Sequence, residues 1–382
     1  MFWRIARKLG FIPVLLILGA LLYWKLHSGP PKAISVGYVA DRDVILWNTL
    51  AQVRESVGEV HYGDRLEVVR VEGPAMQVRT SSGTIGWMRD SRQMMDSDLW
   101  TKSAALLEKT RTMPVQATGR TKTLSNLRVE PGRDAPRIFQ FGRGTPVLIL
   151  KRAVADAPSG PEENSQDEKI TSTDAPQKAK QEDWLLVLRA IDAPPITDGI
   201  TPPPDSATAK MKRSTGDVVS GGPVLSQSGV GTSAPAGLVA GWVLARFVEL
   251  DLPGPVKDLA SSADLHVVAW FELNRVADGS GGEAPQYLVA GTHGGEGQVC
   301  DFTMLRVYTW GTARKRYETA YVESDLCGRL PIRVSNGAKG PEFGFADLDD
   351  SSVDRKYVMV QTAVRRVREA GSHPARTKLA EH

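Results

Sequence analysis

Two stretches of this 382-residue chain repeat each other, and this repeat limits the possible folds more than any other feature. "WNTLAQVRESVGEVHYGDRLEVVRV" aligns without gaps with "RVEPGRDAPRIFQFGRGTPVLILKR", so that Val57 matches Ile138, and Leu46 matches Leu127 one residue before each stretch. Further along, "MQVR" matches "LVLR", and "GWM" matches "GWV". Because these pieces occur twice in the same order, the sequence predicts two copies of one module.

The two copies are expected to be built from strands. Within residues 34–93 and 113–252, short apolar or alternating runs are separated by Gly, Asp and Ser, which is typical of strands joined by turns. Residues 94–112 lie between the copies and carry Met95, Leu99, Leu106 and Leu107 in a loose apolar stripe. This spacing predicts a helical linker.

Two polar segments interrupt the second copy, at 153–182 and 192–236. Both are poor in aromatic residues and rich in Pro, Ser, Gly, Thr and charged residues. Such a composition does not bury enough apolar surface to order a chain. We therefore expect both inserts to be disordered loops within one domain.

Residues 262–369 are again rich in strand-like runs, such as "LHVVAWFELNRV" and "KYVMVQTAVRRV", with turn clusters such as "SNGAKGP" between them. About seven such runs suit an antiparallel β domain, either a small barrel or a sandwich. Residues 370–382 are expected to be a disordered tail. The fold class expected for the whole chain is therefore mostly β.

The N-terminus has the pattern of a membrane anchor. Residues 1–8 are basic, and the run from Leu9 to Trp24 contains no charge. Residues 9–26 are therefore expected to form a transmembrane signal anchor, near the lower length limit for a spanning helix. A cleaved signal peptide is the alternative, although "KLHSGPPKA" offers no clean small-x-small site. Such an anchor implies the inner membrane, with the body in the periplasm or another extracytoplasmic space.

The charge balance and the cysteine count exclude some classes of protein. The chain has 47 basic and 44 acidic residues, a formal net charge of +3, which is too balanced to indicate nucleic-acid binding. Only two cysteines occur, so a zinc-finger spacing of cysteines alone is excluded. Cys300 and Cys327 can pair in a disulfide between neighbouring strands if the body is exported, and two buried free thiols are the alternative.

The second copy resembles bacterial SH3-like (SH3b) domains. The order N-x-R-x-x-P-G, then a Gly before an apolar strand, then W-x-x-V, then G-W-V, carries the resemblance. In the first copy Gly63, Gly86 and Trp87 keep the pattern, whereas "LWNTLAQ" lacks its Arg and its Pro-Gly. The matching residues of the second copy are Asn126, Arg128, Pro131, Gly132, Gly144, Trp184, Gly241 and Trp242.

The resemblance implies two small SH3-like β-barrels joined by the short helix. In exported bacterial proteins such modules bind cell-wall peptides, or act as spacers and partner-docking units. The candidate ligand-binding residues are Arg128, Trp184, Trp242 and Trp87. A tryptophan ring can stack on a ligand, but it can also close an open barrel end by packing into the core. The sequence leaves both interpretations open for Trp87 and Trp242.

The sequence offers little evidence for catalytic residues. Enzymes coupled to SH3b modules are usually wall hydrolases, and one type uses a Cys nucleophile with a His. Cys300 has His293 seven residues before it, but a Cys in a strand with a second Cys available favours a structural role. The sequence therefore predicts no catalytic residue and no cofactor.

Two charged segments are candidate binding sites. "DLDDSSVD" offers Asp347, Asp349, Asp350 and Asp354 as oxygen ligands, but it lacks the Gly that calcium loops need, so we expect a solvated turn and no metal. "TARKRY" is expected to be a hairpin turn with solvated charges, or else a contact for an anionic polymer or lipid.

These observations favour a non-catalytic, membrane-anchored envelope protein. Its SH3-like modules would bind peptide, cell-wall or protein partners as a scaffold or adaptor. The expected partners are the membrane, through the N-terminal helix, and peptidoglycan or envelope proteins, but not nucleic acid. Two alternatives stay open: a cell-wall hydrolase with its chemistry in the C-terminal β domain, and a sensory or regulatory membrane protein with a cytoplasmic body.

Overall fold

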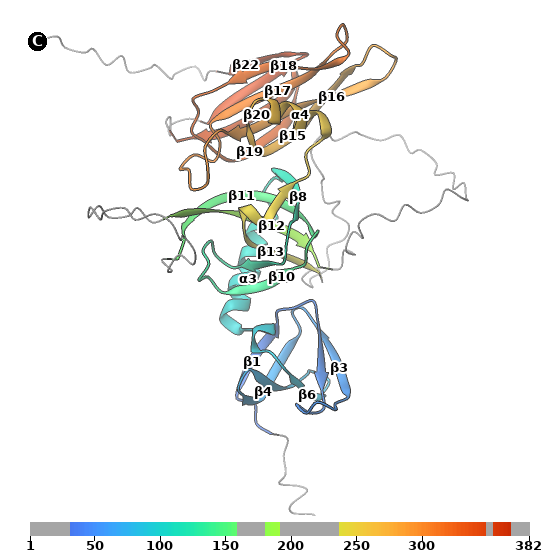
Figure 1. Cartoon of the computed structure of the whole chain (residues 1–382), viewed down its shortest axis with the longest axis vertical. Coiled ribbons are helices and arrows are strands. Elements are labelled where there is room, and N and C mark those ends of the chain that lie inside the picture. The colour runs from blue at the N-terminus through green and yellow to red at the C-terminus, as the bar shows by residue number, and fades with distance from the viewer. Residues whose placement is uncertain (1–30, 159–179, 192–236, 349–353, 368–382) are drawn as a thin grey trace, which may run out of the picture. The chain divides into compact units, whose positions relative to one another are not determined.

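The computed structural model of the chain describes residues 31–158, 180–191, 237–348 and 354–367 (Figure 1). Its described part is mostly β, and its sheets are antiparallel. The expected anchor at 9–26 lies outside the described residues, as does the tail at 370–382. Among the described helices, none has both the length and the apolar character needed to cross a membrane.

The chain divides into two compact units, Met1–Ser97 and Asp98–His382. The first unit holds one seven-stranded sheet with the order β3-β2-β6-β5-β4-β1-β7. Alternating residues of these strands point inward, and Leu46, Val78 and Met88 are fully buried in its core. The strands are β1 (Ser35–Val39), β2 (Asp43–Trp47), β3 (Ser56–His61), β4 (Arg65–Glu72), β5 (Ala75–Arg79), β6 (Ile85–Met88) and β7 (Met94–Asp96).

The second unit begins with a sheet of the same design. Its strand order is β10-β9-β13-β12-β11-β8-β14, which is the order of the first sheet with seven added to each strand number. A short 3-10 helix precedes the last strand in both sheets, Ser91–Gln93 in the first and Ala245–Phe247 in the second. The strands are β8 (Ala117–Thr121), β9 (Ser125–Arg128), β10 (Arg137–Phe141), β11 (Pro146–Asp156), β12 (Gln181–Ala190), β13 (Leu238–Leu244) and β14 (Val248–Leu250).

Close packing explains why both copies keep a glycine before the tryptophan. A Cβ atom at Gly86 would lie 2.7 Å from the Cβ atom of Leu46. A Cβ atom at Gly241 would lie 2.6 Å from the Cγ atom of Leu127. Leu46 and Leu127 are the residues that the sequence alignment matches, so both copies share this packing. Only glycine fits where another chain segment approaches this closely.

The helical linker begins later than its sequence predicts. Helix α3 spans Ser97–Thr110, because the first residues of the expected 94–112 segment form β7. Met95 is buried in that strand rather than on a helix face.

The first insert is also shorter than expected. β11 continues to Asp156 and β12 begins at Gln181, and these two residues pair at the open end of the ladder. The ladder therefore extends into both ends of the expected insert at 153–182, where Ala153 lies opposite Trp184. Residues 159–179 and 192–236 lie outside the described residues.

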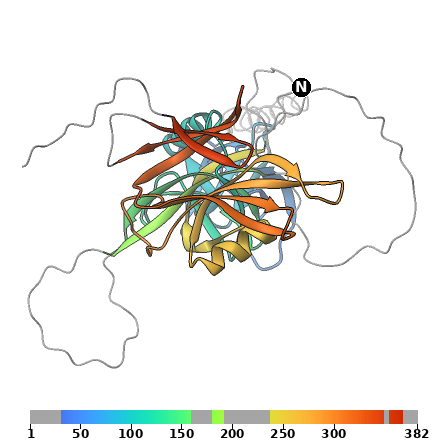
Figure 2. The same ribbon diagram turned by 90° about the horizontal axis from the view of Figure 1, so that it is seen from above.

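The C-terminal region consists of two four-stranded sheets that share one core (Figure 2). Fully buried Leu288 and Val307 from the first sheet and Phe345 from the second belong to this core. Helix α4 (Gly254–Ser262) covers the other face of the first sheet through Val256. The first sheet holds β15 (His266–Ala277), β16 (Glu283–Thr292), β17 (Met304–Gly311) and β18 (Arg316–Glu323), and the second holds β19 (Gly328–Gly337), β20 (Gly340–Asp347), β21 (Arg355–Val360) and β22 (Ala363–Val367).

Candidate functional site

Two of the tryptophans predicted to bind a ligand, Trp184 of β12 and Trp242 of β13, lie on one face of the second seven-stranded sheet. Trp184 is 2% exposed and Trp242 is 9% exposed, and both belong to an apolar cluster. Leu106 and Leu107 of α3 pack against that cluster. These rings therefore pack beneath a helix, and little of their surface is left for a ligand to stack on.

Arg128 is held by its own module. It lies on β9 with Trp242 of β13 as its pairing partner, and its guanidinium donates a hydrogen bond to the carbonyl oxygen of Ala135. Burial lowers the pKa of the Arg128 guanidinium from its ordinary value. This bond fastens Arg128 to the loop that follows Pro131 and Gly132, which is a structural role.

The corresponding position in the first unit carries an aromatic pair. Trp47 of β2 pairs with Trp87 of β6, in the place that Arg128 and Trp242 take in the second copy. Trp87 is buried, whereas Trp47 is partly exposed and has the guanidinium carbon of Arg54 4.4 Å from its ring centroid. The Trp47 ring thus offers the kind of face that attracts a cation.

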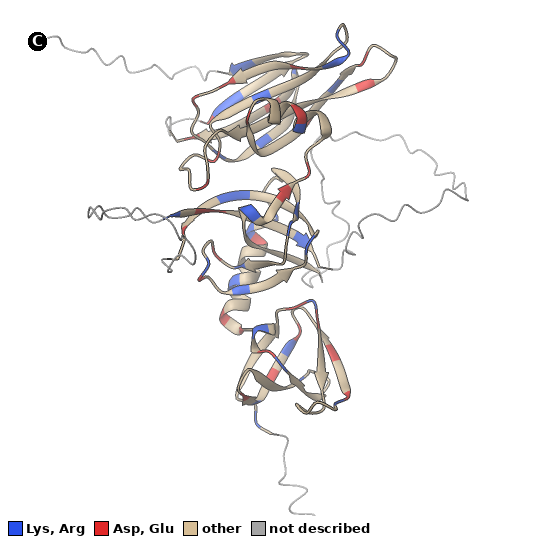
Figure 3. Ribbon diagram, viewed as in Figure 1, with Lys and Arg blue, Asp and Glu red and all other residues tan. Residues whose placement is uncertain are grey.

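The most unusual polar group in the described chain is Arg152 of β11. Charged residues of both signs are interspersed along the strands (Figure 3), but Arg152 is only 4% exposed. Its guanidinium donates to the two carboxylate oxygens of Asp183, at 2.6 and 3.0 Å. A buried guanidinium needs such partners, since an unpaired buried charge is strongly destabilising.

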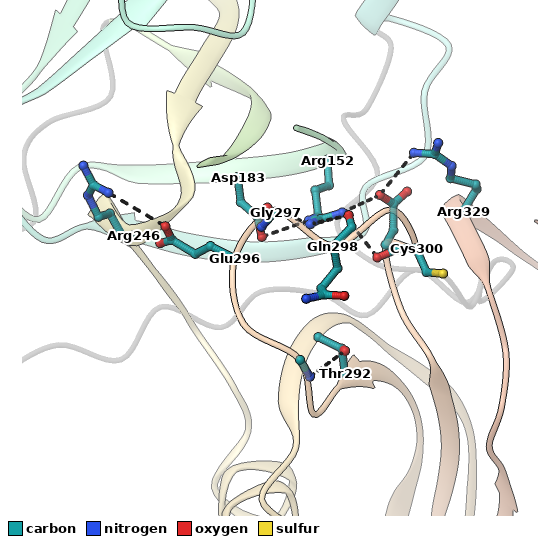
Figure 4. A network of polar contacts seen from close by, with 11 residues as sticks. Arg152, Asp183, Arg246, Thr292, Glu296, Gly297, Gln298, Cys300 and Arg329 are labelled. Atoms are coloured by element: carbon teal, nitrogen blue, oxygen red, sulfur yellow. Dashed lines mark hydrogen bonds and ion pairs between the residues drawn. The ribbon is translucent and has the colours of Figure 1, made fainter. Parts of the chain in front are cut away.

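The remaining donors of Arg152 reach the C-terminal region (Figure 4). They contact the carboxylate of Asp301 at 3.1 Å and the carbonyl oxygens of Gln298 and Cys300 at 3.0 and 3.4 Å. All three acceptors lie between β16 and β17. In the other direction, the backbone N–H of Gly297 donates to Asp183 at 2.8 Å. Arg152 and Asp183 therefore join the second module to the C-terminal sheets, and we call this contact the Arg152 clamp.

Asp301 is placed for this role by the second C-terminal sheet. It is 1% exposed, and its other carboxylate oxygen accepts the backbone N–H of Leu330 at 2.8 Å. Arg329 lies 3.7 Å from the same carboxylate. Each oxygen of this buried carboxylate therefore has a donor, as burial of a charge requires.

A second ion cluster lies beside the clamp. Glu182 is buried, and it accepts from Arg133 at 2.8 Å and from Arg246 at 3.0 Å. Burial by itself raises the pKa of the Glu182 carboxyl, but the bonds to Arg133 and Arg246 outweigh burial, so the pKa lies below its ordinary value. Arg246 also lies 3.8 Å from Glu296 in the loop after β16 (Figure 4).

Gln116 makes a third contact between the same two parts. It is fully buried just before β8. Its side-chain amide donates to the carbonyl oxygen of Ile332 at 3.2 Å and accepts the backbone N–H of Ile332 at 2.7 Å. The backbone carbonyl oxygen of Gln116 accepts a hydrogen bond from the backbone N–H of Trp270 at 3.0 Å. One glutamine thereby bonds to both C-terminal sheets.

Cys300 and Cys327 form a disulfide with an S–S distance of 2.06 Å. Cys300 lies in the loop between β16 and β17, and Cys327 directly precedes β19, so the bridge joins two loop positions rather than neighbouring strands. A sulfur held in a disulfide is not a thiolate nucleophile. His293 is also engaged, since its Nδ1 atom lies 2.7 Å from the carbonyl oxygen of Asp264.

The acidic residues of "DLDDSSVD" that the structure describes lie in different environments. Asp347 is buried and forms an ion pair with Arg355, and Asp354 is exposed, while Asp349 and Asp350 lie outside the described residues. Ion pairing with Arg355 gives Asp347 a structural role. The basic turn forms the β17–β18 hairpin, with Arg314 3.1 Å from Glu318.

Over the described ranges, one group of side chains could hold a metal ion. Its members are Asp43, Glu59 and His61, whose ligand atoms lie within 4.8 Å of one another. All three are exposed, and His61 already bonds to Asp43 at 2.9 Å. Exposed groups of this kind commonly carry no ion, so the group is not evidence of a metal site.

The clamp residues were not predicted from the sequence. Arg152 directly follows Lys151, and Asp183 directly follows Glu182, so in the sequence each looks like part of a solvated charged pair beside an apolar run. Gln116 has no signal of its own, because a glutamine in a polar segment normally faces solvent. Comparison with protein-family models and with curated proteins finds no match for this chain.

Proposed function

We propose that the chain is a non-catalytic scaffold of the bacterial envelope, anchored in the inner membrane by residues 9–26. The seven-stranded sheets are interpreted as two divergent SH3-like barrels, as the repeated glycine and tryptophan positions suggest. The Arg152 clamp carries the scaffold proposal. Its buried, paired charges hold the second module against the C-terminal sheets. Such a fixed joint favours a supporting role for this module over a ligand-binding one.

The two modules are proposed to have different roles. The second module uses its tryptophans to hold α3 and Arg128 to hold its own loop, so it serves as the support. The first unit keeps accessible apolar surface on β2, where Ile45 is 45% exposed and Trp47 lies on the same side of the strand. We assign contact with a peptide or envelope-protein partner to this surface.

The disulfide favours a body that lies outside the cytoplasm. Disulfides persist in oxidising compartments and are rare in the cytoplasm. Membrane-impermeant thiol labelling of intact and lysed cells tests the proposal. We expect Cys300 and Cys327 to be labelled in intact cells only after reduction. Labelling that needs lysis but no reduction would place the body in the cytoplasm.

Binding to purified peptidoglycan and to envelope proteins tests the scaffold role. Trp47→Ala and Ile45→Glu in the full-length chain should weaken binding by roughly tenfold or more, since a buried aromatic or aliphatic anchor dominates such contacts. Val360→Glu, at an apolar residue in the C-terminal region that is 41% exposed, is the matched control. Hydrolysis of the wall polymer by the purified chain would instead support the enzyme alternative.

A further inference from the structure

The disulfide lies at the end of the loop that the Arg152 clamp holds. Cys300 supplies a carbonyl oxygen to Arg152, and its side chain is bonded to Cys327. Gln298 supplies a second carbonyl oxygen, and Gly297 donates its backbone N–H to Asp183. Residues 294–300 are therefore attached to the second module by polar contacts and to the C-terminal sheets by a covalent bond. We call this stretch the latch segment.

The neighbouring residue Asp301 is held independently of the disulfide. Its backbone N–H donates to the carbonyl oxygen of Gly328 at 2.9 Å, and Gly328 donates in turn to Phe302 at 3.0 Å. Its side chain accepts the N–H of Leu330. Breaking the disulfide would leave this backbone pairing intact, so the Arg152–Asp301 contact does not depend on the bridge.

The two sulfur atoms differ in access. Cys327 is buried, whereas Cys300 is partly exposed and follows Val299, whose side chain is 68% exposed. A reductant therefore reaches the Cys300 side of the bridge first. Thiol–disulfide exchange depends on which sulfur is attacked and on access to it.

We propose that the Cys300–Cys327 disulfide is a redox-sensitive latch, which sets how firmly the second module is joined to the C-terminal sheets. In the oxidised state the bridge holds the Gln298 carbonyl in reach of Arg152 and the Gly297 N–H in reach of Asp183. In the reduced state residues 294–298 detach from Arg152 and Asp183. The Cys300 carbonyl shares a planar peptide unit with the Asp301 N–H, which stays bonded to Gly328, so it keeps its place, and the Arg152–Asp301 and Gln116–Ile332 contacts also persist. The joint loosens without either part unfolding. This inference rests on the geometry of the clamp and holds whichever partner the first unit binds.

The reductant required is a dithiol, either a small molecule or a dithiol protein. One of its thiolates attacks the sulfur of Cys300, which forms a mixed disulfide and releases Cys327 as a thiolate that takes up a proton. The second thiolate of the reductant then attacks the reductant sulfur that is bonded to Cys300. This closes a disulfide within the reductant and releases Cys300 as a thiolate, which takes up a proton. Two electrons pass from the dithiol to the protein, and the dithiol becomes a disulfide.

Hydrogen exchange of the full-length chain with and without dithiothreitol tests the latch. We expect the amide of Gly297, which donates to Asp183, to exchange at least about tenfold faster after reduction, because a hydrogen bond to a charged group contributes roughly that factor to local stability. The amides of β19 and β20 should keep their protection. Unchanged exchange in the latch segment overturns the proposal. Loss of protection throughout β15–β22 also overturns it, because the bridge would then stabilise the whole core.

Two variants complete the test. The double variant Cys300→Ser with Cys327→Ser should reproduce the reduced pattern and show no further response to dithiothreitol. Arg152→Lys keeps the charge but removes the fork that reaches several acceptors, so its latch segment should exchange fast in both redox states. Arg314→Lys, at an exposed pair, is the matched control and should behave as the wild type. A latch segment that stays protected in both cysteine and Arg152 variants would refute the coupling between bridge and clamp.

Discussion

Arg152 and Asp301 are separated by 149 positions in the chain, yet their side chains meet at 3.1 Å with almost no exposure to solvent. The contact links β11 of the second module to the loop that precedes β17. Charges buried in this way must be paired, and the pairing fixes which parts of the chain lie together.

Removal of the Arg152 guanidinium should destabilise the second unit more than any surface substitution. Arg152→Ala leaves the buried carboxylate of Asp301 and the partly buried carboxylate of Asp183 without their main cation, and a loss of about 3–5 kcal/mol in the free energy of unfolding is expected. Denaturant unfolding followed by fluorescence measures it. Arg314→Ala removes an exposed pair with Glu318 and should change stability by less than about 1 kcal/mol. Equal effects of the two substitutions would contradict the role of the clamp.

Gln116 should be intolerant of apolar replacement even though it is a neutral residue. Gln116→Leu leaves the backbone N–H and the carbonyl oxygen of Ile332 without their partner in a buried place. Each unsatisfied buried group costs about 1–3 kcal/mol, so the unfolding midpoint of the second unit should fall clearly. Gln298→Ala is the control, because Gln298 contributes its backbone carbonyl and its side chain is exposed. A midpoint equal to that of the control would show that water replaces the amide.

The two matched glycines should respond alike to a methyl group. Gly86→Ala and Gly241→Ala both force a Cβ atom against the aligned leucine of the same copy. Overpacking of this kind costs about 1–3 kcal/mol, and thermal unfolding of each variant measures it. Gly254→Ala is the control, since a Cβ atom there meets nothing within 4 Å. If one copy tolerated the methyl group and the other did not, the two cores would not be equivalent.

The pKa of His61 should depend on the charge of Asp43. The hydrogen bond to the Asp43 carboxylate raises the pKa of His61 above 6.5. Because the pKa in the folded state is raised, the stabilisation is fully present below pH 6.5 and is lost as the pH rises through the folded-state pKa. Asp43→Asn should move the His61 titration back toward 6.5, as followed by NMR of the ring protons.

A His61 titration curve that is unchanged in Asp43→Asn would mean that Asp43 does not supply the interaction.

The sequence determined the elements that depend on near neighbours. The alternation of apolar residues located the strands, and the aligned glycines at 86 and 241 marked one module used twice. Both signals are local, because side chains alternate along a strand and a missing Cβ is visible in the residue type. The ends of the helical linker and of the first insert differ from the predicted ends, because strand pairing places β7, β11 and β12 partly within the predicted segments.

The tertiary structure alone decided which polar residues are buried. Arg152 and Glu182 look like ordinary surface charges in the sequence, and Gln116 looks like a solvated amide. Their burial depends on partners up to 216 positions away, such as Ile332 for Gln116. The same applies to Trp184, which was predicted as a ligand contact, and to Trp242, which the sequence left open between packing and ligand contact. Both belong to the cluster against which α3 packs. A residue type states what a side chain can bond to, but only the fold brings the partner within reach and removes the water.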